Sequence, residues 1–85
     1  MESNYYNVLG IANSASTKEI RSAYRKLARR FHPDINPNNQ VAAARFKEIQ
    51  IAYDVLGNDE KKKKYDIIII KYEFNIPFGI NYIFT

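Results

Sequence analysis

The apolar spacing within "SASTKEIRSAYRKLARRF", residues 14–31, constrains the fold most. At about 100° per residue its apolar residues share one side of a helix. They are Ile20, Ala23, Tyr24, Leu27, Ala28 and Phe31. Ser16 followed three residues later by Glu19 is a capping-box pattern and marks the start. Pro33 ends the helix, because proline disfavours helical geometry at the preceding residue, His32.

A second amphipathic helix is predicted from near Asn39 through "QVAAARFKEIQIAYDVL", with Gly57 closing it. Its apolar side carries Ala42, Phe46, Ile49, Ala52, Tyr53 and Leu56. Two amphipathic helices joined by a loop of about eight residues pack as an antiparallel hairpin. His32, Pro33 and Asp34 then lie in the loop at its tip.

Short helices flank this hairpin in the sequence. In "NYYNVLG", residues 4–10, Asn4 suits an N-cap and Gly10 suits the left-handed position after a helix. "DEKKKKYD", residues 59–66, follows the predicted cap Asn58. We therefore predict an all-α fold for residues 1–66, with the antiparallel hairpin as its centre.

Residues 67–85, "IIIIKYEFNIPFGINYIFT", form an apolar C-terminal tail that the pattern leaves open. Isoleucine and aromatic enrichment favours a hairpin around 77–79, although an isolated hairpin is marginal in water. Alternatively, residues 67–70 extend the fourth helix. Ile51 and Val55 fall on the outward arc of the helix at 40–56, so the tail could also fold back over them. An unstructured end and weak membrane-surface association are further alternatives.

Composition excludes several classes of function. The 85 residues fit one small domain, which argues against a deep substrate pocket. The chain has no cysteine and one histidine, so we expect no disulfide, metal site or cofactor. The first ten residues lack the charged and apolar regions of a signal peptide. We therefore expect a soluble cytoplasmic protein, with an organelle matrix as the alternative, and we expect it to be a monomer.

Cations gather on the side of the first amphipathic helix opposite its apolar stripe. They are Lys18, Arg21, Arg25, Lys26, Arg29 and Arg30, and we expect no acidic residue among them. Such an arc lacks the i,i+4 ion pairs that stabilise an exposed helix. The net charge of +4 has the same sign. These charges favour an acidic partner over a merely solvated face.

The tripeptide at 32–34 permits several interpretations. His32 could interact with the carbonyl end of the helix dipole, or act with Asp34 as a catalytic base. No nucleophile lies beside this pair in the sequence, so we expect no enzyme activity. The run Lys61–Lys64 resembles either a nucleic-acid patch or the exposed side of a helix. It lacks interleaved aromatic residues, and we expect no nucleic-acid binding.

Taken in order, these segments resemble the J domain of the DnaJ/Hsp40 co-chaperone family. "NYYNVLGI", "EIRSAYRKLARRFHPD", "RFKEIQIAYDVL" and "DEKKKKYD" are each similar to a family segment, and together they cover residues 4–66. His-Pro-Asp alone is weak evidence, but between these two helices it is specific. The family's glycine/phenylalanine linker, cysteine modules and client-binding domains have no counterpart here, so clients are expected only indirectly.

The resemblance implies that the chain binds the ATP state of an Hsp70 and stimulates its ATP hydrolysis, with no catalytic residue of its own. Asp34 would pair with an arginine of the partner, while His32 and Pro33 fix the loop. An acidic surface of the Hsp70 nucleotide-binding domain would receive the helix face, namely Arg21, Tyr24, Arg25, Lys26 and Arg30. Supporting rim contacts would come from Asn36, Phe46 and Lys47. A J-like module without stimulating activity and a nucleic-acid-binding helical domain are the alternatives.

Overall fold

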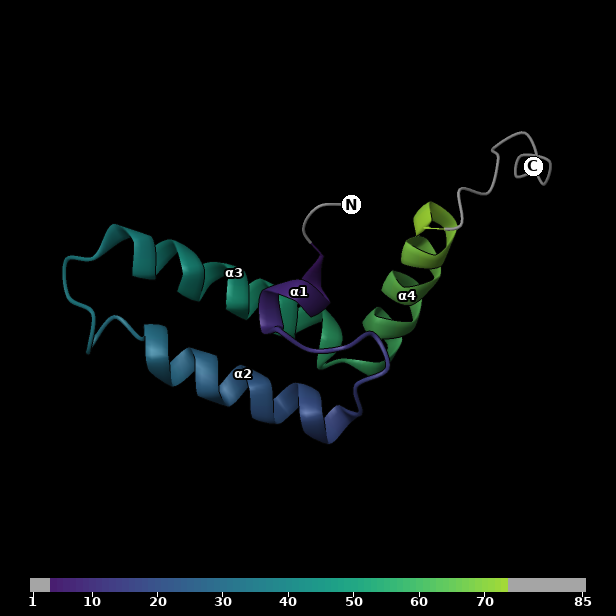
Figure 1. The fold of residues 1–85 in the computed structure, drawn as a ribbon, viewed down its shortest axis with the longest axis horizontal. Coiled ribbons are helices and arrows are strands. Elements are labelled where there is room, and N and C mark those ends of the chain that lie inside the picture. Colours follow the sequence, from purple (N-terminus) through teal and green to yellow (C-terminus); the bar gives the residue numbers. More distant parts are fainter. Residues whose placement is uncertain (1–3, 74–85) are drawn as a thin grey trace.

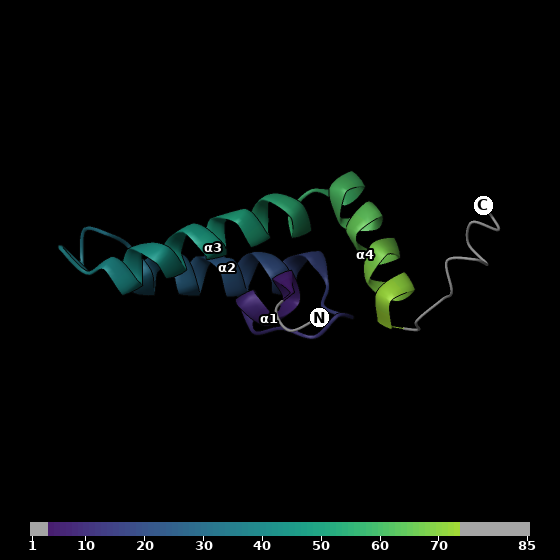
Figure 2. The same ribbon diagram turned by 90° about the horizontal axis from the view of Figure 1, so that it is seen from above.

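The computed structural model describes residues 4–73, with the backbone alone for 71–73. This part of the chain forms four α-helices and no strand: α1 Tyr5–Leu9, α2 Thr17–Phe31, α3 Gln40–Leu56 and α4 Asp59–Glu73. Helices α2 and α3 run side by side as an antiparallel hairpin (Figures 1 and 2). Helix α1 packs on the hairpin away from its tip, and α4 departs at an angle from the end of α3. The predicted all-α hairpin architecture is confirmed.

Local sequence signals set the beginnings of the helices. The predicted N-caps each accept a backbone N–H from three residues on, and they are Asn4, Ser16 and Asn58. Asn39, near which the third helix was predicted to begin, caps α3 in the same way. Glu19 completes the predicted capping box by accepting the Ser16 backbone N–H at 2.7 Å. Gly10 ends α1 with a φ of 68°, which glycine adopts without steric penalty.

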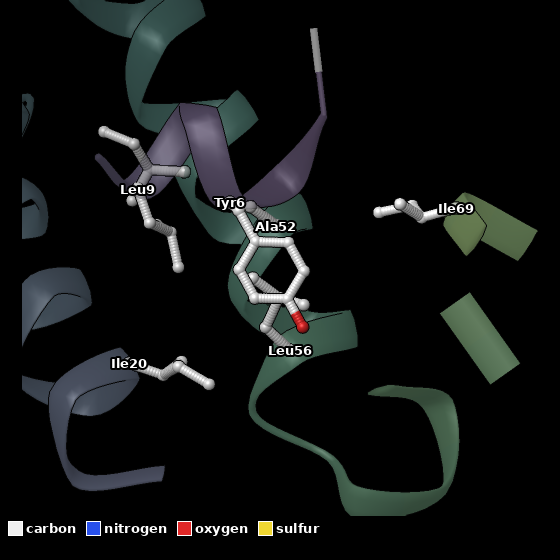
Figure 3. Packing of buried hydrophobic residues seen from close by; sticks show 7 residues of the cluster. Tyr6, Leu9, Ile20, Ala52, Leu56 and Ile69 are labelled. Atoms are coloured by element: carbon white, nitrogen blue, oxygen red, sulfur yellow. The ribbon is translucent and has the colours of Figure 1, made fainter. Parts of the chain in front are cut away.

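The core lies where α1 and α4 meet the open end of the hairpin (Figure 3). All four helices contribute to it through Tyr6, Leu9, Ile20, Ile49, Ala52, Leu56 and Ile69. The predicted apolar stripe of α2 supplies further packing. Tyr24 from that stripe stacks on Tyr53 of α3, with ring centroids 4.1 Å apart.

Helix α4 is longer than predicted. It continues past Asp66 to Glu73, so the alternative in which residues 67–70 extend the fourth helix is confirmed. The extension contributes to the core, because Ile69 is only 5% exposed. Isoleucine favours strands weakly, and burial of Ile69 against the hairpin overrides that preference. The predicted domain boundary after Asp66 therefore falls inside a helix.

The outward arc assigned to α3 needs one correction. Ile51 is 46% exposed, as expected, but Val55 is half-buried and packs against the core. The predicted turn at 77–79 lies outside the described residues, as does any fold-back or membrane contact by residues 74–85. None of the helices formed by residues 4–73 is long and apolar enough to cross a membrane.

Candidate docking site

The loop at the hairpin tip is built on His32. Its backbone turns out of the helix at φ −60° and ψ 138°, as expected for a residue that precedes proline. The Asp34 N–H donates to His32 Nδ1 at 3.1 Å, and the Ile35 N–H donates to the His32 carbonyl at 3.1 Å. The Nδ1 atom therefore acts as an acceptor within the loop. The Asp34 carboxylate lies 3.7 Å from the same nitrogen.

Asn36 fastens the loop to the end of α2. Its side-chain amide donates to the carbonyls of Arg30 and His32, both at 2.9 Å. Carbonyls at a helix C-terminus lack intrahelical partners, so this amide supplies a donor to the Arg30 carbonyl and a second donor to the His32 carbonyl. The rim role that the family resemblance implies for Asn36 stays a prediction beside these internal contacts. The bond from Asn36 to the Arg30 carbonyl could not be predicted from a local pattern, because the two residues are six positions apart.

Two further residues expected at the rim lie on α3. Phe46 is half-buried and meets the edge of the His32 ring, with centroids 5.4 Å apart at 70°. Phe46 therefore supports the loop through its contact with the His32 ring. Lys47 is exposed on the same helix. Within residues 4–73, neither a hydrogen bond nor an ion pair joins Lys47 to the loop.

The result is an exposed carboxylate on a braced loop. The Asp34 side chain is 88% exposed and that of His32 is 47% exposed. Within residues 4–73, no group of three or more metal-ligating side chains comes together. A carboxylate exposed in this way can accept charge-assisted hydrogen bonds.

The cations of α2 are all exposed, as predicted: Lys18, Arg21, Arg25, Lys26, Arg29 and Arg30. They do not form one uniform face. Lys26 and Arg30 line a groove of about 770 Å³ between α2 and the segment that joins α1 to α2. Glu19 lines the same groove, which corrects the expectation that no acidic residue shares this arc.

The lysine run of α4 is partly engaged within the molecule. Lys61 lies 3.1 Å from the Asp54 carboxylate, and Lys62 lies 2.9 Å from that of Asp66. Two of the four lysines are therefore already ion-paired to this chain's own acids. The run does not present four uncommitted charges to a nucleic-acid backbone.

These features define a class: a small helical docking module, with a carboxylate at its tip and cations along one helix. The family model for the DnaJ domain matches residues 4–66. Over 66 residues the chain is 53% identical to the chaperone protein DnaJ of Chlorobaculum tepidum and 54% identical to that of Chlorobium limicola. These matches cover 78% of this chain and 16% of each relative.

Solved structures agree with the sequence matches. The J-Trx1 fragment of ERdj5 superposes with a TM-score of 0.71 at 48% identity, over 75% of this chain and 31% of the fragment. A second structure, ERdj5 form II, gives 0.68 at 49% identity over 74% of this chain and 8% of that one. The chain belongs to the DnaJ-domain family, the J domains of DnaJ-type co-chaperones, which are not enzymes in the usual sense. It spans about a sixth of the length of the curated relatives it matches.

Proposed function

We propose that this chain is an Hsp70 co-chaperone that binds the ATP state of an Hsp70 and stimulates its ATP hydrolysis. The observation that carries the proposal is the Asp34 carboxylate, 88% exposed on a loop braced from both helices of the hairpin. Family membership supports an Hsp70 as the partner. ATP hydrolysis then takes place on the partner, and clients are affected only through it.

Asp34 makes the decisive contact in this proposal. A carboxylate can bind an arginine of the partner through two parallel charge-assisted hydrogen bonds, which fixes both distance and orientation. Such a bond requires the carboxylate to be held in advance. His32 and Asn36 supply that support through the hydrogen bonds at 3.1 and 2.9 Å described above.

The exposed cations of α2 supply the approach. Arg21, Arg25, Lys26 and Arg30 bind an acidic surface on the nucleotide-binding domain, with Tyr24 at the edge of the contact. Complementary charges raise the association rate more than they raise the affinity. Added salt screens them, so docking weakens as ionic strength rises. Phe46 and Lys47 stay predicted supporting positions, and a cytoplasmic monomer stays the expected form.

The test is a single-turnover measurement of ATP hydrolysis by an Hsp70 from the source organism, with Arg25→Glu compared against Lys64→Glu. Both residues are exposed, and both substitutions change the net charge equally. Arg25→Glu raises the concentration needed for half-maximal stimulation by about tenfold or more, because it places an anion against an acidic surface. Lys64→Glu leaves it near the wild-type value. Equal effects of the two variants contradict docking through α2.

A further inference from the structure

Ile35 occupies an unusual position for an apolar side chain. It is 65% exposed and directly follows Asp34 in the loop. Scattered exposed apolar residues are common on protein surfaces and carry no meaning alone. What distinguishes Ile35 is its place beside the most functionally important carboxylate of the proposed interface.

The backbone around Ile35 is held at three consecutive residues. The N–H groups of Asp34 and Ile35 both bind His32, and the Asn36 N–H donates to the Pro33 carbonyl at 3.2 Å. The Cα atoms of Asp34 and Ile35 are therefore fixed relative to one another. Isoleucine is branched at Cβ, which restricts its χ1 rotamers. Little conformational entropy is lost when such a side chain is buried by a partner.

Neighbouring apolar surface changes the strength of a polar contact. An ion pair that is surrounded by apolar contacts is sheltered from water, and the lower local dielectric strengthens it. Ile35 directly follows Asp34 in the chain, and both side chains are exposed on the same braced loop. If polar groups surround the cationic group of the partner, Ile35 finds no apolar contact there. If apolar groups surround it, Ile35 is buried against them.

We propose that Ile35 is a specificity-determining residue: it selects an Hsp70 in which the cationic group that receives Asp34 is bordered by an apolar patch. This inference rests on the proposed co-chaperone function and adds the chemistry of the partner surface. Electrostatic attraction by α2 brings the partner in. Burial of Ile35 then distinguishes the matching partner from one with a polar rim.

The test measures Hsp70 ATP hydrolysis against the concentration of five chains: wild type, Ile35→Ser, Ile35→Leu, Val41→Ser and Asp34→Asn. Val41 is the matched control, because it is 75% exposed at the start of α3. Ile35→Ser raises the half-maximal concentration by about tenfold with an unchanged maximal rate, since apolar burial is lost and Asp34 is kept. Ile35→Leu restores binding to within about threefold, because a hydrophobic side chain of equal size replaces the original.

The outcomes distinguish a failure of the Ile35 role from a failure of the proposed co-chaperone function. Amide spectra establish that each variant keeps the wild-type fold. If wild type stimulates hydrolysis and Ile35→Ser behaves like it, or like Val41→Ser, the role of Ile35 is wrong and the co-chaperone function stands. If wild type and Asp34→Asn give the same hydrolysis rate, the co-chaperone function itself is wrong, and the role of Ile35 with it.

Discussion

The Tyr6 hydroxyl donates a 2.5 Å hydrogen bond to the carboxylate of Asp66, across 60 positions of sequence. Lys62 binds the other oxygen of that carboxylate at 2.9 Å. This arrangement joins α1 to α4 at the edge of the core. Nearby, the Tyr65 hydroxyl accepts the Tyr5 backbone N–H and the two rings stack. The first and last helices of the described chain therefore hold each other against the hairpin.

Alkaline pH should loosen this junction. Burial, and next the hydrogen bond to Asp66, raise the pKa of Tyr6 from 10.0 to about 12. The hydrogen bond with Asp66 also raises the pKa of Lys62. Both groups hold their protons more tightly when folded, so their stabilisation is complete below the unfolded pKa and is lost above it. We expect the free energy of unfolding to stay level up to about pH 10 and to fall between about pH 10 and about pH 12.

Urea denaturation at a series of pH values measures this dependence. In Tyr6→Phe the tyrosine contribution is absent, so the decline over the same window is shallower and reflects Lys62. A wild-type protein whose stability is unchanged from neutral pH to about 12 contradicts the assigned role of the Tyr6 proton.

At neutral pH, Tyr6→Phe should itself destabilise the protein. The ring still fills the core, but the Asp66 carboxylate loses a donor, which costs about 1–2 kcal/mol. In a domain of this size that lowers the melting temperature by several degrees. Tyr53→Phe is the control, because no hydrogen bond to the Tyr53 hydroxyl occurs within residues 4–73. Calorimetry that gives both variants the same melting temperature counts against the junction.

Asn36→Ala should destabilise the loop and the end of α2 together. The Arg30 carbonyl loses its side-chain donor and the His32 carbonyl keeps only the Ile35 N–H, with an expected loss of about 1–2 kcal/mol in unfolding free energy. Amide hydrogen exchange at Asp34 and Ile35 should speed up relative to α3. Asn13→Ala in the exposed segment before α2 is the matched control. Unchanged exchange in the loop of Asn36→Ala shows that the amide does not brace it.

Gly10→Ala tests the left-handed turn that ends α1. An added Cβ meets no atom within 4 Å, so the penalty arises from the positive φ alone and amounts to about 1–2 kcal/mol. Gly10→Asn should lose less, since asparagine tolerates this conformation. Thermal denaturation that ranks asparagine below alanine contradicts this explanation.

Helix positions followed from the sequence because their signals are local. The four caps, the capping box and the turn before Pro33 each depend on residues at most three positions apart, and periodicity located the stripes. Long-range contacts were not predictable in the same way. The length of α4 depends on burial of Ile69 by other helices, and the Asn36 amide bonds carbonyls four and six residues away. The proposed role of Asp34 rests on the resemblance to J domains, since an exposed carboxylate has no distinguishing local pattern.

The most direct test of the central claim compares Asp34→Asn with Asp54→Asn in stimulating ATP hydrolysis by an Hsp70. Both side chains are largely exposed, at 88% and 69%, and both substitutions remove one negative charge. We expect Asp34→Asn to lose stimulation by about tenfold or more, because a charge-assisted bond to the partner is removed, while Asp54→Asn retains it. Equal stimulation by Asp34→Asn and wild type would contradict the account.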